Sequence, residues 1–188
     1  MTMATTCSVF IATSLDGFIA RLDGSIDWLN EANTAVPSGE DCGYQRFIST
    51  IDAHVIGRHT FQLIQSFPDW LYGATPVHVL SKSMTSLPEG LPATVTLSSE
   101  QPAELVERMA AEGKRHLYVD GGETIQRFLS DGLIDDIIIT RVPVLIGTGT
   151  PLFGPLPGDQ QLEHITTRAY DFGFVQSRYR VIPREPRR

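Results

Sequence analysis

Two short segments of the chain combine residue types that bind anions. They are residues 56–61, Ile-Gly-Arg-His-Thr-Phe, and residues 118–124, Tyr-Val-Asp-Gly-Gly-Glu-Thr. Each follows an apolar run typical of a β-strand and begins a stretch typical of a helix. The first N–H groups of a helix lack intrahelical partners and the helix dipole adds to their positive potential, so such turns hold phosphates. The two segments predict a ligand with phosphates at two separate points.

A dinucleotide cofactor meets this requirement, and the 2′-phosphate of NADPH accounts for the arginine of the first segment, Arg58. Gly57 and the hydroxyl of Thr60 lie in the same turn. In the second segment, Gly121 and Gly122 let the backbone approach a ligand closely. Taken singly, each segment could also be an ordinary turn. Their combination favours NADPH.

A third segment has similar chemistry. In Ser81-Lys82-Ser83, two hydroxyls flank one cation directly after an expected strand. An exposed lysine needs no functional explanation, so this segment counts only together with the other two. The glycines of residues 147–153 do not add a fourth site, because they lack the third glycine of a dinucleotide fingerprint and lead into a proline instead of a helix.

Two carboxylates are candidates for catalysis. Asp16 lies in the turn Ser-Leu-Asp-Gly, where Asp-Gly is a common loop pair, and would face the pocket in the functional interpretation. Asp41 is either a plain helix N-cap or, if burial raises its pKa, a proton donor. We expect both near the substrate, with Asp41 the better candidate for the donor.

The elements that position these residues follow from periodicity and turn signals. Alternating strands and helices predict a mostly parallel sheet, and residues 164–182 read as an antiparallel hairpin around Asp171-Phe172-Gly173. Ligands of such folds bind at the carboxyl ends of the strands. Strands are expected at 7–13, 53–56, 76–81, 94–97, 117–120 and 136–144, and helices at 26–32, 41–50, 60–66, 102–112 and 123–130.

Composition limits the class of protein. A chain of 188 residues predicts a single domain, residues 1–183, followed by a flexible tail, 184–188. The net charge of −7 argues against nucleic acid or a membrane surface as a partner. Cys7 and Cys42 have no partner motif and are expected to be free thiols of a cytoplasmic protein. The histidines lack metal-ligand spacing, so no metal is expected.

Five segments in this order resemble the dihydrofolate-reductase-like superfamily, and most closely the C-terminal reductase domain of the riboflavin-biosynthesis protein RibD. They are residues 14–20, 55–61, 79–82, 119–123 and 143–154. The Gly-Gly turn followed downstream by Leu-Ile-Gly-Thr-Gly-Thr-Pro-Leu-Phe is the most specific part. The resemblance implies a dihydrofolate-reductase-like three-layer α/β/α fold, with a mostly parallel central sheet and a C-terminal antiparallel hairpin.

The resemblance also implies where the cofactor binds. One group of residues would hold the 2′-phosphate end of NADPH, a second group would take the pyrophosphate on backbone amides, and the first strand would flank the nicotinamide. In that order, the residues are Gly57, Arg58, Thr60, Ser81 and Lys82; Gly121, Gly122, Glu123 and Thr124; and Ala12.

The residues expected on the substrate side depart from the patterns of both the dihydrofolate reductases and the riboflavin reductases. Asp41 has the spacing of the carboxylate that protonates folate in dihydrofolate reductases. However, no lysine or arginine that could bind a folate tail occurs between Arg58 and Lys82. Phe18 stands where the riboflavin reductases have an Asp-Gly-Lys pattern. The expected helix at 41–51 also lacks the His and Arg pattern that grips a ribose phosphate. Substitute cations for that phosphate would be Arg21, Arg46 and Arg141.

The resulting hypothesis is an NADPH-dependent reductase. Its nominal activity is that of a 5-amino-6-(5-phosphoribosylamino)uracil reductase, with hydride transfer to a pyrimidine- or pterin-like substrate. The alternatives are a dihydrofolate reductase and a non-catalytic NADP-binding protein of the same fold. The apolar alternation of the late hairpin predicts pairing with a second copy in a homodimer.

Overall fold

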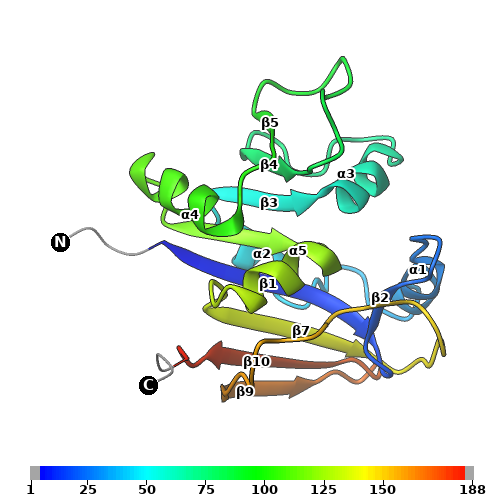
Figure 1. Ribbon diagram of the computed structural model, residues 1–188. Coiled ribbons are helices and arrows are strands. Elements are labelled where there is room, and N and C mark those ends of the chain that lie inside the picture. The colour runs from blue at the N-terminus through cyan, green and yellow to red at the C-terminus, as the bar shows by residue number, and fades with distance from the viewer. Residues whose placement is uncertain (1–4, 185–188) are drawn as a thin grey trace.

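The computed structural model describes residues 5–184, built around one eight-stranded sheet (Figure 1). A separate two-stranded sheet pairs β2 with β8. In chain order the elements are β1 (Thr6–Ser14), β2 (Phe18–Ala20), α1 (Asp27–Asn33), α2 (Tyr44–Ile48), β3 (Ala53–Gly57), α3 (Arg58–Gln65), β4 (Val77–Leu80), β5 (Val95–Ser98), α4 (Pro102–Ala111), β6 (His116–Asp120), α5 (Gly122–Ser130), β7 (Asp136–Val142), β8 (Thr150–Pro151), β9 (Leu162–Ala169) and β10 (Val175–Val181).

The strand order of the main sheet is β5-β4-β3-β6-β1-β7-β10-β9. The first six are mutually parallel, whereas β10 runs antiparallel to both β7 and β9. This confirms the predicted mostly parallel sheet with a C-terminal antiparallel hairpin. The strand β9 forms one edge of the sheet and is largely exposed, and pairing of this edge with a second copy stays a prediction.

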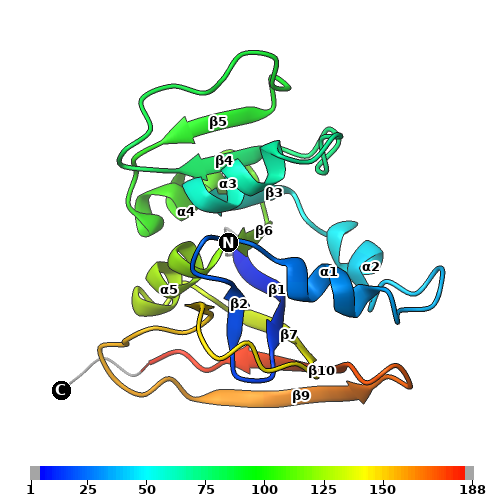
Figure 2. The ribbon, with the colours of Figure 1, turned by 90° about the vertical axis from the view of Figure 1, so that its right-hand side faces the viewer.

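Helices cover both faces of the sheet, which gives the predicted three layers (Figure 2). Successive side chains of β1 point to opposite faces of the sheet, so both faces need a covering of helices. Val9 packs with α4 and α5 in the largest core cluster, whereas its neighbour Phe10 packs on the opposite face against α2. The amphipathic helix α5 contributes Ile125 and Phe128 to that core, both fully buried. The helices α1, α2 and α3 contribute Trp28, Phe47 and Phe61 to the core clusters of the second face.

Two local predictions need correction. The helix expected over 41–50 is only the five residues of α2, because Cys42 and Gly43 have left-handed backbone φ angles of 53° and 82° and end any helical path from Asp41. The short strands β2 and β8 were not predicted; Phe18 pairs with Pro151 there. Their pairing joins distant loops, so no local periodicity announces it.

The end of the described chain is anchored. Arg184, assigned from sequence to a flexible tail, donates to Gln160 Oε1 at 2.8 Å and to the carbonyl oxygen of Leu129 at 3.0 Å. The rest of that tail, residues 185–188, lies outside the described residues. Within 5–184, no helix is long and apolar enough to cross a membrane, and no group of three or more His, Cys, Asp or Glu side chains is placed to hold a metal ion.

Candidate functional site

The two predicted anion-binding segments lie side by side. Strands β3 and β6 are parallel neighbours, and Ile56 is paired with Asp120. Both strands therefore end at the same edge of the sheet, where β3 leads directly into α3 and β6 into α5. Segments far apart in sequence thus form one turn-and-helix pair at the carboxyl ends of the strands, as the parallel sheet predicts.

The two turns interlock through glycine and threonine. A Cβ added to Gly57 would lie 2.6 Å from Thr124 Oγ1, and a Cβ on Gly121 would collide with Thr60 Oγ1. Each segment's glycine therefore faces the threonine of the other segment. Gly121 has in addition a φ of 97°, which L side chains rarely adopt. Only glycine at both positions allows the two turns to approach this closely.

Both helices present N–H groups at this junction. Gly57 is the N-cap of α3 and Gly121 the N-cap of α5, and neither receives a side-chain cap from the described residues. A cavity of about 860 Å³ opens in front of them. The residues lining it include Ala12, Leu29, Gly57, Arg58, His59, Thr60, Asp120, Gly121, Gly122, Glu123 and Thr124.

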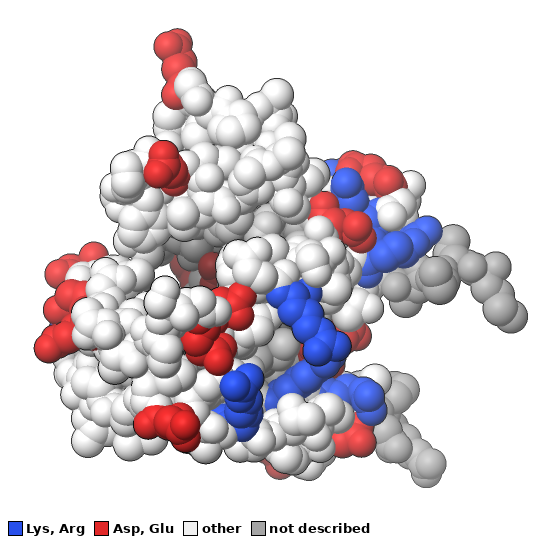
Figure 3. Space-filling model, turned by 180° about the vertical axis from the view of Figure 1, so that it is seen from behind, with Lys and Arg blue, Asp and Glu red and all other residues white. Residues whose placement is uncertain are grey.

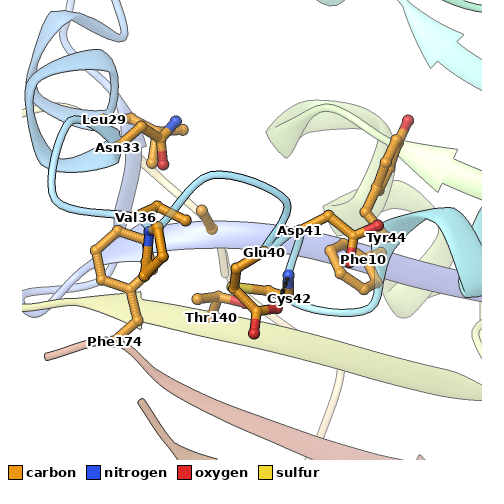
Figure 4. A pocket seen from close by; sticks show the side chains of 12 residues that line it. Phe10, Leu29, Asn33, Val36, Glu40, Asp41, Cys42, Tyr44, Thr140 and Phe174 are labelled. Carbon is orange, nitrogen blue, oxygen red and sulfur yellow. Dashed lines mark hydrogen bonds between the residues drawn. The ribbon is translucent and has the colours of Figure 1, made fainter. Parts of the chain in front are cut away.

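A second cavity of about 560 Å³ adjoins the first (Figure 4). Ala12 of β1 and Leu29 of α1 line both, so the two spaces meet at Ala12, near the carboxyl end of β1. The other residues lining the second cavity are Phe10, Asn33, Val36, Pro37, Glu40, Asp41, Cys42, Tyr44, Thr140 and Phe174.

Most residues predicted to hold a cofactor line the larger cavity, but Ser81 and Lys82 line neither cavity. Ser81 follows β4 and is buried, and its hydroxyl oxygen accepts the backbone N–H groups of Ser83 and Met84 at 3.2 and 3.0 Å. This hydroxyl thus closes a turn. Contact of Ser81 and Lys82 with a cofactor phosphate stays a prediction.

Asp41 is not a proton donor with a raised pKa. It lines the smaller cavity, but its carboxylate accepts the N–H groups of Gln45 and Gly43, both at 2.8 Å. These hydrogen bonds, that of Gln45 foremost, lower the pKa of the exposed Asp41 carboxyl. The N-cap residue of α2 is Gly43, so Asp41 is not the predicted N-cap. Its carboxylate still has a capping role, because it accepts the N–H of Gln45 in the first turn of α2.

We expect Asp41→Ala to lower Tm at pH 7 by about 2–4 °C, because the N–H groups at the start of α2 lose their acceptor. Asp41→Asn keeps one acceptor oxygen, so its Tm should fall less. The folded state lowers the pKa of Asp41 below 3.8. The stability that the Asp41 carboxylate contributes is therefore present above pH 3.8 and is lost as the pH falls further. Thermal unfolding followed by circular dichroism at pH 7 and pH 3 measures both effects; equal Tm values for wild type and Asp41→Ala at pH 7 would contradict the capping role.

Asp16 also has a structural role and lines neither cavity. Its carboxylate accepts the Ser14 hydroxyl at 2.6 Å and the N–H of Gly147 at 2.8 Å, and these bonds, that of Ser14 first, lower its pKa. Asp16 therefore ties the turn after β1 to the loop after β7. The prediction that it faces the pocket is wrong.

Asp120 is a functional candidate that sequence reasoning did not single out as a carboxylate. It lies at the end of β6 in the wall of the larger cavity, and its Oδ1 accepts the N–H of Gly121 at 2.8 Å. Burial raises the pKa of Asp120 to about 6. Its position directly before the Gly-Gly turn was the available signal, because a carboxylate at a strand's carboxyl end reaches the ligand edge of the sheet.

The sequence matches the family model of the RibD C-terminal domain over residues 5–175. The uncharacterized protein YwjB of Bacillus subtilis (strain 168) is 34% identical over 165 residues, covering 86% of this chain and 90% of that protein. The uncharacterized protein YyaP of the same organism is 26% identical over 182 residues, covering 90% and 91% of the two chains.

Solved structures of riboflavin-biosynthesis proteins are also similar to this chain. The crystal structure of a "Putative riboflavin biosynthesis protein" from Shewanella sp. PV-4 has a TM-score of 0.88 and 38% identity, covering 95% of this chain and 99% of that one. The diaminohydroxyphosphoribosylaminopyrimidine deaminase/5-amino-6-(5-phosphoribosylamino)uracil reductase of Thermotoga maritima shares the fold, with a TM-score of 0.70 and 12% identity; the match covers 95% of this chain and 57% of that chain. The family match over nearly the whole length, together with this shared architecture, shows that the chain belongs to the RibD C-terminal domain family, with its dihydrofolate-reductase-like fold.

Proposed function

We propose that this protein is an NADPH-dependent reductase that transfers a hydride to a pyrimidine- or pterin-like heterocycle. The observation that carries the proposal is the pair of helix N-termini, Gly57 of α3 and Gly121 of α5, held together by their glycine–threonine contacts at one cavity. Two such termini side by side suit a ligand with separated phosphate groups.

The residues of the larger cavity fit a dinucleotide. Side chains are excluded from Gly57 and Gly121 because a Cβ there would collide with the threonine of the other segment, so the two turns form a closely packed backbone cradle. Arg58, at the start of α3, adds a guanidinium suited to a 2′-phosphate. The bound cofactor would supply the hydride, and the protein would supply binding, orientation and electrostatics.

The chain's own residues account for the positioning. Ala12 has a small side chain and lines both cavities, so a flat ring can lie against β1 at the point where the cavities meet. The smaller cavity then holds the acceptor. Aromatic and aliphatic residues, including Phe10, Leu29 and Phe174, give that space apolar walls against which a flat ring can pack.

The first test is a titration with NADPH and with NADH, followed by tryptophan fluorescence, for wild type and Arg58→Ala. Loss of charge-assisted hydrogen bonds to the 2′-phosphate should weaken NADPH binding by roughly 10- to 100-fold and leave NADH binding nearly unchanged. Arg46→Ala is the matched control, since Arg46 is exposed on α2 and lines neither cavity. Failure of wild type to bind either cofactor would overturn the proposal.

A further inference from the structure

The charged side chains that line the smaller cavity are acidic. Its charged lining residues are Glu40 and Asp41, and no lysine, arginine or histidine of residues 5–184 lines it. In the view from behind (Figure 3), lysine and arginine side chains lie mostly on the right-hand half of the face, whereas the hollow in the surface lies on the left. A phosphorylated acceptor would therefore bring its negative charge to two carboxylates without a cation in the lining.

The two carboxylates are held in place by the loop before α2. Glu40 Oε1 accepts the N–H of Cys42 at 2.7 Å, and Asp41 accepts two backbone N–H groups. Cys42 takes its left-handed φ of 53° between these bonds, and its carbonyl oxygen accepts Gln176 Nε2 at 2.9 Å. Because backbone bonds fix the loop on both sides, the carboxylates cannot simply swing away from an anion.

The arginines that sequence analysis offered as phosphate partners do not fill the gap. Arg21, Arg46 and Arg141 line neither cavity, and Arg21 is engaged by Asp27 at 2.6 Å. Arg168 Nη2 lies 3.4 Å from Glu40 Oε2, but this arginine is 65% exposed and stacks over Tyr170 outside the lining. An anion in the cavity would have to compete with Glu40 for it.

The remaining lining suits a flat ring with hydrogen-bonding edges. Phe10 and Tyr44 form one aromatic wall, with ring centroids 5.5 Å apart, and Phe174 lies across the space (Figure 4). Thr140 Oγ1 accepts Gln176 Nε2 at 2.9 Å, so the Thr140 hydroxyl proton is free to be donated to a ring nitrogen or oxygen. Carboxylates accept hydrogen bonds from amino groups.

From this lining we infer that the acceptor is an amino-substituted, planar nitrogen heterocycle that carries no phosphate. The inference rests on the proposed function, since it assigns the substrate class of the same reductase. In the reaction, bound NADPH would supply the hydride that forms a C–H bond at a ring carbon as the C=N π bond breaks. The ring nitrogen would take a proton from water, and the cofactor would be released as NADP⁺. The family's phosphoribosyl-type substrate is then not this chain's substrate.

The test compares two fluorescent probes that differ only in the phosphate: 2,4-diamino-6-hydroxymethylpteridine and its phosphate ester. Each is titrated into the NADPH-saturated protein. We expect the unphosphorylated probe to bind at least about tenfold more tightly. Glu40→Gln should narrow this ratio by strengthening ester binding, and Asn33→Lys, which adds a cation at the exposed end of α1, should narrow it further. Glu89→Gln, in the β4–β5 loop away from both cavities, is the charge-matched control and should leave the ratio unchanged.

Equal or tighter binding of the phosphate ester to wild type would overturn the inference, as would binding of neither probe by protein that binds NADPH. In both cases the cofactor proposal stands. If NADPH itself does not bind, the proposed function is wrong, and the two probes are then titrated into the protein without NADPH to test the smaller cavity alone. Tighter binding of the unphosphorylated probe in that titration would support the inferred class of ligand for the cavity.

Discussion

Gly121→Ala is expected to weaken NADPH binding by at least about 100-fold. Two effects act together. The backbone φ of 97° is strained for any residue with a Cβ, and that Cβ would collide with Thr60 Oγ1. Relief of the collision pushes the start of α5 away from the start of α3, so the N–H groups no longer converge on the phosphates. Fluorescence titration measures the affinity, and chemical denaturation measures an expected loss of about 1–3 kcal/mol from backbone strain.

The chain contains a matched control at the other end of the same helix. Gly132 has a φ of 72°, but a Cβ there would meet nothing within 4 Å. Gly132→Ala should therefore carry the strain of a positive φ without a collision, and should still bind NADPH normally. Equal loss of NADPH affinity in both variants would show that destabilisation, and not the fit between the two turns, weakens binding. Normal NADPH binding by Gly121→Ala would contradict the proposed cofactor cradle.

The cofactor side of the site could be predicted because its signals are local. A glycine at a strand-to-helix turn predicts a helix N-terminus that can bind an anion, and it places this N-terminus at the carboxyl end of a strand. Gly57 and Gly121 carried that information, and the parallel sheet then brought the two turns together. What the pattern did not contain is the reciprocal contact of each glycine with the other segment's threonine, since that depends on the distance between α3 and α5.

The acceptor side could not be predicted in the same way. Asp41 lines the smaller cavity, but its hydrogen bonds to Gly43 and Gln45 depend on left-handed backbone around Cys42, which no periodicity indicates. Asp16 looked like a pocket carboxylate, yet its partners include Gly147, more than a hundred residues away in sequence. The role of a carboxylate is decided by its tertiary partners, and these are set by loops rather than by strands or helices.

Asp120→Asn is expected to make the protein more stable at neutral pH. Burial raises the pKa of Asp120 from 3.8 to about 6, so between pH 4 and 6 the folded state binds more protons than the unfolded state. Stability of the wild type therefore falls as the pH rises through that window. Asparagine has no charge to bury and can still accept the N–H of Gly121, so the variant should gain about 1–3 kcal/mol at pH 7 and almost nothing at pH 3.

Asp52 provides a control of opposite sign. Its carboxylate accepts the N–H groups of Arg115 and His116, and these bonds, that of Arg115 foremost, lower its pKa. Asp52→Asn should therefore lose stability at pH 7, and this loss should shrink as the pH falls below 3.8. Urea unfolding of both variants at pH 3 and pH 7 separates the two signs. An Asp120→Asn variant that is no more stable than wild type at pH 7 would refute the raised pKa of the Asp120 carboxyl. A stabilising substitution there would mean that Asp120 is held at a cost to folding, as ionisable groups in ligand cavities commonly are.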